Sequence, residues 1–300
     1  MTAKPRFIET RAGASLALAV VMTIWGASVP ITKAAIADLP PVLLAALRFA
    51  LAAALLWPFY RAKRRAGAVA IAPSTAVLLG LTGVTLYYLG YNVGLLYTSA
   101  SHAALLQSAV PAVTAVLAFF WLRERLSPAA IAGIVLSVGG VLLIVSGRPT
   151  GGHAPDPLLG NSLVISAIFC WAVYTILAKR VAGYDPLVVT VATSVAGLAL
   201  LAPAVAVEYA LGARPNFTSG GIVAVLYLGI VSSALAYALY GASLRALGAS
   251  QVATWVNLMP VVAVASSAVF LGERIDARTL IGGAIVLAGV ALATMTRRRT

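Results

Sequence analysis

Aromatic and amide side chains recur at helical spacing inside a long apolar stretch of the sequence. Tyr88, Tyr91, Asn92 and Leu95 follow the spacing i, i+3, i+4, i+7, which places them on one face of a helix. Aromatic rings attract an ammonium group or stack on apolar groups, and hydroxyl and amide groups can hydrogen-bond to a carboxylate or carbonyl. This face therefore suits a small amphipathic solute such as an amino acid better than a sugar or phosphate.

The same residue types occur again elsewhere in the chain. Tryptophan and tyrosine are also enriched where membrane helices meet water, so their depth in the apolar stretch decides between the two interpretations. The repeated tryptophans and Tyr88 lie near the middle of their stretches, which favours lining of a cavity and leaves helix packing as the alternative. The recurring residues are Tyr237, Tyr240 and Leu244, which match the first face, and two pairs, Trp25 with Ser28 and Trp171 with Tyr174.

Charged residues are scarce inside the apolar stretches. Arg48 is the exception, and we expect it to extend toward the outer surface, with contact to a substrate carboxylate as the alternative. The acidic residues all fall at the ends of stretches or between them, so no carboxylate is placed to relay protons or sodium. The two histidines, His102 and His153, are far apart and Cys170 is the single cysteine, so we expect no metal site and no cofactor.

The composition explains what must position these residues. The 300 residues are 61% hydrophobic and only 10% charged, whereas soluble proteins are about 45–50% apolar and about 25% charged. These values exclude a soluble enzyme, a coiled coil and a disordered chain, and they predict an all-α integral membrane protein embedded in the lipid bilayer. Ten spans are expected, at roughly 13–33, 40–59, 75–98, 103–122, 128–146, 158–178, 186–206, 221–244, 250–271 and 278–296.

The formal net charge of +13 is read as a signal of orientation. Most Lys and Arg residues fall on one side if both termini are cytoplasmic, as the positive-inside rule requires. We therefore expect a multi-pass protein of a bacterial inner membrane, with no nucleic-acid partner. We expect a monomer whose partner is a small-molecule substrate.

The chain repeats itself. At an offset of 146, Trp25 matches Trp171, and at an offset of 149, Tyr88 matches Tyr237. Each copy contains five expected helices, an odd number, so the second copy must be inverted in the membrane. We predict a first five-helix repeat over 1–146, a linker over 147–157 and a second repeat over 158–300.

Both copies also contain a proline within their fourth helix. Pro111 and Pro260 each remove a helical hydrogen bond and predict a kink, with a gating role as an open possibility. Asn257 lies one turn before the second of these prolines and is a further candidate for contact with a solute.

The ends of both copies resemble the EamA family of the drug/metabolite transporter superfamily. The resemblance covers nearly the whole chain, and its most diagnostic piece is LGERI at 271–275, which LRERL at 122–126 repeats. The first copy departs from the pattern, because Arg123 stands where the second has Gly272. The resemblance implies a ten-helix metabolite transporter, and many members export amino acids and related compounds.

The expected function is therefore export of amino acids, aromatic ones included, or of similar metabolites by alternating access. Exchange driven by the substrate gradient alone is favoured because no carboxylate lies within a span. An importer or a broad-specificity drug efflux protein remains the alternative. A membrane enzyme or a scaffold is a different class and is not favoured, because no catalytic cluster of polar residues is found.

Overall fold

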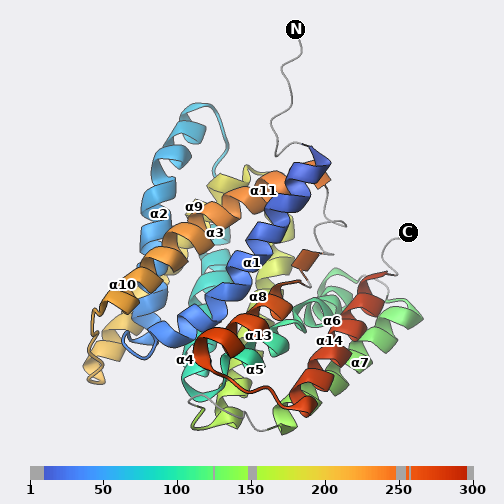
Figure 1. Ribbon diagram of the computed structural model, residues 1–300. Coiled ribbons are helices and arrows are strands. Elements are labelled where there is room, and N and C mark those ends of the chain that lie inside the picture. Colours follow the sequence, from blue (N-terminus) through green and yellow to red (C-terminus); the bar gives the residue numbers. More distant parts are fainter. Residues whose placement is uncertain (1–9, 124–125, 148–153, 248–254, 257, 296–300) are drawn as a thin grey trace.

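The computed structural model describes residues 10–123, 126–147, 154–247, 255–256 and 258–295, and this part of the chain is helical. The first half begins with two long helices and continues through interrupted ones (Figure 1). Its elements are α1 (Arg11–Ala35), α2 (Pro41–Arg65), α3 (Pro73–Gly80), η2 (Leu81–Leu86), α4 (Tyr87–Tyr97), α5 (Ala100–Gln107), α6 (Val110–Leu122) and α7 (Pro128–Ser146).

The second half has the same general order. Two long helices are again followed by an interrupted one. Its elements are α8 (Pro157–Ala178), η3 (Lys179–Val181), α9 (Pro186–Ala210), α10 (Ser219–Leu226), η4 (Tyr227–Leu235), α11 (Ala236–Leu247), α13 (Leu258–Leu271) and α14 (Ala277–Met295).

The helices are apolar enough to cross a bilayer. Seven of the described helical segments have the length and composition of a span, and three shorter apolar helices follow at Ser219–Leu235, Leu258–Leu271 and Ala277–Leu292. Large apolar side chains also face outward, for example Phe120 and Phe270, both 70% exposed, as lipid contact requires. The predicted multi-pass helical membrane protein is confirmed, whereas the count of ten spans stays a prediction.

The sequence signals account for most helix boundaries. Several helices begin after a polar side chain that accepts a hydrogen bond from a backbone N–H of the first turn. These residues are Ser99, Ser127, Asp185 and Thr218. The expected second span at 40–59 proved too short, because α2 continues through Pro58 to Arg65.

The third helix of each half contains a π-helical segment. Residues Leu81–Leu86 and Tyr227–Leu235 adopt this wider winding, and the two segments overlap when the halves are compared at the offset of 149. Such segments are rare and occur often at functional sites, because they change the direction in which the following side chains point. Here each π-helical segment precedes the tyrosines singled out above.

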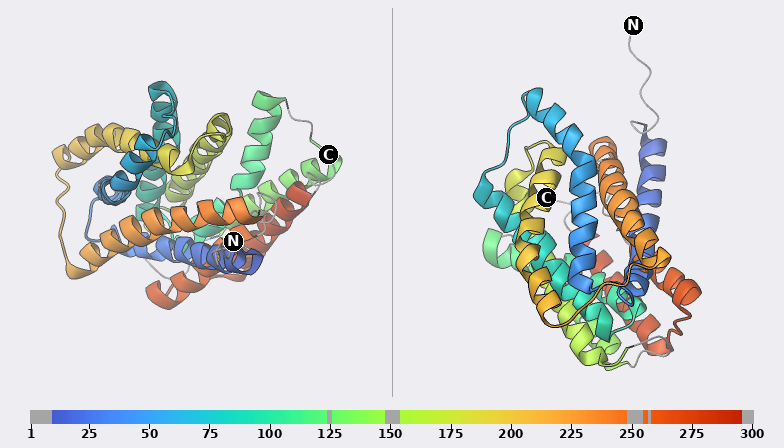
Figure 2. Two further views of the ribbon diagram at one scale, coloured as in Figure 1. Left: turned by 90° about the horizontal axis from the view of Figure 1, so that it is seen from above. Right: turned by 90° about the vertical axis from the view of Figure 1, so that its left-hand side faces the viewer.

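Helices of the two halves pack against one another. α7 lies beside α14, α1 beside α11 and α13, α4 beside α8, and α2 beside α9 (Figures 1 and 2). Glycines allow the closest of these approaches. A Cβ on Gly289 would lie 2.5 Å from the carbonyl oxygen of Gly133, and one on Gly140 would lie 2.6 Å from that of Gly282.

The fourth expected helix, which covers Ala100–Leu122 in the structure, is interrupted by an irregular turn just before Pro111. α5 ends at Gln107 and α6 begins at Val110, so Pro111 stands in the first turn of a new helix. Pro260 lies buried near the start of α13. The expected ninth span begins at residue 250, and its first residues, together with Asn257, lie outside the described residues.

Candidate functional site

Trp25 forms one aromatic cluster with tyrosines of the other half. Its ring centroid lies 5.4 Å from that of Tyr237 and 5.3 Å from that of Tyr240. Its indole Nε1 donates a hydrogen bond to the carbonyl oxygen of Ser232 at 2.9 Å. This cluster therefore joins α1 to η4 and α11.

Trp171 forms a second cluster, in which a tryptophan of the second half contacts a tyrosine of the first half. This tryptophan of the second half has its ring centroid 4.9 Å from that of Tyr87 in the first half and 4.9 Å from that of Tyr174. Tyr87 in turn stacks on Tyr91 at 5.6 Å and meets Tyr88 edge-on at 4.8 Å. Each tryptophan thus contacts tyrosines of the other half.

Tyr87 belongs to this second aromatic cluster, although it is not among the residues selected from the sequence. It is 7% exposed, and its hydroxyl accepts a hydrogen bond from Gln107 Nε2. Its spacing of i, i+4 from Tyr91 is a helical signal that could have identified it.

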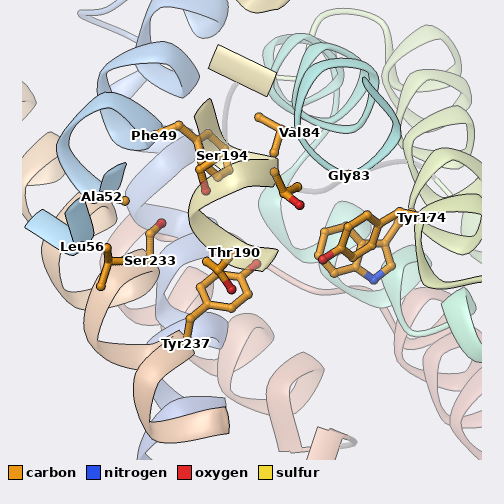
Figure 3. Close-up of a pocket in the computed structure, with 12 residues that line it drawn as sticks. Phe49, Ala52, Leu56, Gly83, Val84, Tyr174, Thr190, Ser194, Ser233 and Tyr237 are labelled. Carbon is orange, nitrogen blue, oxygen red and sulfur yellow. The ribbon is translucent and has the colours of Figure 1, made fainter. Parts of the chain in front are cut away.

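A cavity lies between α2, η2, α8, α9 and η4–α11 (Figure 3). Its wall is apolar on α2 and carries hydroxyls on α9. Its volume of about 30 Å³ holds one or two water molecules, so a larger solute needs its walls to move apart. The lining residues are Phe49, Ala52, Leu56, Gly83, Val84, Trp171, Tyr174, Thr190, Thr193, Ser194, Ser233 and Tyr237.

Some of the expected site residues point elsewhere. The Ser28 hydroxyl donates to the carbonyl oxygen of Trp25 at 2.6 Å, within its own helix. Asn92 Nδ2 donates to the carbonyl oxygen of Pro41 at 3.0 Å and so ties α4 to the start of α2. By contrast, the hydroxyl of Tyr91 is buried and has no hydrogen-bond partner in the described part of the chain.

The expectation that Arg48 extends toward the outer surface is wrong. The residue is 7% exposed, with Nε donating to Ser233 Oγ at 2.7 Å and Nη2 to Ser232 Oγ at 3.1 Å. Its Cζ lies 5.1 Å from the ring centroid of Tyr88, a cation–π distance. The two serines belong to the other half of the chain, so the sequence spacing within α2 gave no sign of them.

Both halves of the chain match a known protein family. The pattern of the EamA-like transporter family matches residues 12–146 and again residues 158–295. An uncharacterized transporter of Archaeoglobus fulgidus is 33% identical over 286 residues, covering 93% of this chain and 96% of its own. A probable amino-acid metabolite efflux pump of Salmonella typhimurium is 30% identical over 290 residues, covering 92% of each chain.

The fold is also found among solved structures. One crystal structure aligns with a TM-score of 0.65 and 23% identity, covering 97% of this chain and 99% of its own. The helical fold and the family matches define a multi-pass membrane transporter. The chain belongs to the EamA-like transporter family of the drug/metabolite transporter superfamily, as its sequence motifs predict.

Proposed function

We propose that this protein exports amino acids, aromatic ones included, or similar small metabolites by alternating access. The observation that carries the proposal is the exchange of aromatic contacts between halves, Trp25 with Tyr237 and Trp171 with Tyr87. A solute bound among these rings would touch both halves at once. Movement of one half against the other would therefore expose the solute to one side of the membrane and then to the other. The name of the Salmonella relative, a probable amino-acid metabolite efflux pump, supports the choice of substrate class.

The proposed architecture is ten spans in two inverted repeats, over 1–146 and 158–300, with a linker between them. The packing supports this architecture. α4 packs against α8, and their counterparts in the opposite halves, α11 and α1, also pack against each other. Both termini would be cytoplasmic, and the protein would lie in the inner membrane of a bacterium.

The transport is proposed to follow the substrate gradient. The described carboxylates are held at helix ends, and the described interior carries a cation instead, Arg48. Pro111 and Pro260 would provide the points at which the fourth helix of each half moves, and Asn257 would contribute a polar contact beside the second of them.

Metabolite profiling tests the proposed class of substrate. Medium from cells that overproduce the protein should be enriched in one or a few amino acids relative to cells that overproduce the Trp171→Ala variant. Uptake of these labelled compounds into proteoliposomes then separates direct transport from a metabolic effect. An unchanged medium, or equal enrichment by the variant, contradicts the proposal.

A further inference from the structure

The guanidinium of Arg48 is a buried charge without an opposite charge in the described part of the chain. It forms no ion pair there, and the described carboxylates bind other groups. Glu208 accepts from the backbone N–H groups of Val42 and Leu43, and Glu273 from those of Ala100 and Ser101. A buried charge is costly unless a partner compensates it, so a cation inside a membrane protein that lacks an opposite charge is a candidate site for an anion.

The hydrogen bonds of Arg48 leave one end of its guanidinium available. An arginine has five N–H donors, and those that bind Ser233 and Ser232 lie on the edge formed by Nε and Nη2. Nη1 makes no hydrogen bond to a described residue. The end formed by Nη1 and Nη2 can therefore take both oxygens of a carboxylate, the pairing that arginine favours.

The serines and the tyrosine hold this group in a fixed orientation. Ser232 and Ser233 are 0% and 3% exposed and lie in η4, where the π-helical winding places two successive residues within reach of the same guanidinium. The Tyr88 ring contacts the guanidinium from α4. A side chain fixed in advance loses little further conformational freedom when a ligand binds.

Arg48 does not itself line the cavity, but it lies one helical turn before Ala52 in the wall that α2 provides, and its Nε donates to Ser233, which lines the cavity. Arg48, Ala52 and Leu56 follow one another at i, i+4 and i+8, so they lie on one face of α2, and Ala52, Leu56 and Phe49 line the cavity. Each helical turn advances about 5.4 Å, so about two turns of α2 separate the Arg48 position from Leu56. A carboxylate at one end and an apolar group along the next two turns match the shape of an amino acid with a large side chain.

The charge also breaks the similarity between the halves. At the offset of 146, the position of Arg48 corresponds to Ser194, which lines the cavity from α9. One end of the site is therefore cationic and the equivalent end carries a hydroxyl. A ligand with one carboxylate has a single preferred orientation in such a site.

We propose that Arg48 binds the carboxylate of the transported solute through Nη1 and Nη2. This inference rests on the proposed function and specifies its substrate class: solutes with one carboxylate and an adjoining apolar group. An ammonium group on the solute is compatible with the site but not required for recognition by Arg48.

Ligand binding by the purified full chain in nanodiscs tests the assignment. The probes are 3-phenylpropanoate, phenylalanine and phenylalaninamide, of which only the last lacks a carboxylate. The wild-type protein should bind both carboxylates at least about 10-fold more tightly than the amide, since a hydrogen bond to a charged group contributes about 1.5–3 kcal/mol. Arg48→Gln should weaken binding of the carboxylates by about 10- to 100-fold and binding of the amide by less than about 2-fold.

Further variants separate binding from folding. Arg61→Gln removes an exposed charge from the same helix and should leave all three affinities unchanged. Ser233→Ala keeps the charge but loosens the guanidinium, so it should reduce the preference for carboxylates even if Arg48→Gln fails to fold. Arg48→Lys keeps the charge but cannot form a bidentate hydrogen-bonded pair, so this variant should bind carboxylates about 10-fold more weakly than the wild type.

Two results overturn the inference: no carboxylate binds the wild-type protein, or Arg48→Gln retains the preference for acid over amide. The failure of the proposed function looks different. If carboxylates bind through Arg48 but no amino acid crosses a proteoliposome membrane, the export proposal is wrong and the assignment of Arg48 stands.

Discussion

The hydroxyl of Ser101 donates a hydrogen bond to Oε2 of Glu273 at 2.6 Å, although the two residues belong to different halves of the chain. The same carboxylate accepts from the backbone N–H groups of Ala100 at 2.7 Å and Ser101 at 2.9 Å. The carboxylate therefore accepts hydrogen bonds from N–H groups of the first turn of α5 that have no partner within the helix, at the end where the helix dipole favours a negative charge. Glu273 is 5% exposed and joins the loop before α14 to the N-terminus of α5.

Other buried polar contacts surround this pair. Thr98 donates to Asn161 Oδ1 at 2.6 Å, Lys33 Nζ donates to the carbonyl oxygen of Thr98 at 3.0 Å, and the ring of His102 meets the Thr279 hydroxyl at 3.0 Å. Loss of the Glu273 charge should thus loosen one end of the helix bundle.

Glu273→Gln should lower the thermal unfolding temperature of the purified protein by a few degrees. The amide has one acceptor oxygen where the carboxylate has two, and its NH₂ group would face backbone donors, at a cost of about 1–3 kcal/mol. Asp156→Asn is the matched control, because Asp156 is an exposed N-cap and asparagine caps a helix about equally well. Equal unfolding temperatures of Glu273→Gln and the wild type would contradict a stabilising role of the carboxylate.

Arg123→Gly should stabilise the protein by about 1 kcal/mol, because a left-handed backbone is costly for any residue with a Cβ. Arg123 ends α6 with φ of 52°, and Gly272, its counterpart in the second half, has φ of 64°. The two halves thus keep the same backbone turn although the residue differs. Gly272→Ala should destabilise by a similar amount, since no atom lies within 4 Å of the added Cβ and only the backbone conformation opposes it. Thermal melts of both variants check the pair, and a shift of the same sign in both contradicts it.

Gly289→Ala should destabilise the protein by about 1–3 kcal/mol, because the new methyl group cannot fit between α14 and α7. Its Cβ would lie 2.5 Å from both the Gly133 carbonyl oxygen and Ser137 Oγ. Gly139→Ala, on α7 itself, meets no atom within 4 Å and should be neutral or slightly stabilising, since alanine favours a helix. Thermal melts of the two variants check this prediction, and Gly139→Ala should have the higher melting temperature. A lower melting temperature for Gly139→Ala than for Gly289→Ala would refute the prediction.

The sequence predicted the helical membrane fold because apolar length alone specifies a span. Composition and periodicity do not specify which helices become neighbours, and this limit explains the error at Arg48. Its partners Ser232 and Ser233 are more than 180 residues away and belong to the other half. Pro111 did predict an irregularity in the fourth helix, and α5 ends at Gln107 and α6 begins at Val110, but the proline does not specify how the two helical parts are joined. Tyr237 and Tyr240 were selected as candidate site residues because the chain repeats itself, and in the structure both rings lie beside that of Trp25.

Substitution of Trp171 addresses the proposed transport site. Trp171→Ala removes the ring that contacts Tyr87 and Tyr174, so binding of an aromatic or apolar solute should fall by about 10-fold or more. Trp171→Phe keeps an aromatic face and should retain part of the activity. Trp121→Ala is the matched control, because Trp121 is 57% exposed on the outer surface and its loss should leave transport unchanged.

Counterflow of labelled phenylalanine in proteoliposomes, with no imposed pH or sodium gradient, tests the central claim most directly. Vesicles loaded with unlabelled phenylalanine and containing the wild-type protein or Trp121→Ala should transiently accumulate the label, whereas vesicles with Trp171→Ala should not. Accumulation by Trp171→Ala at the wild-type rate, or none by the wild type, would contradict the account.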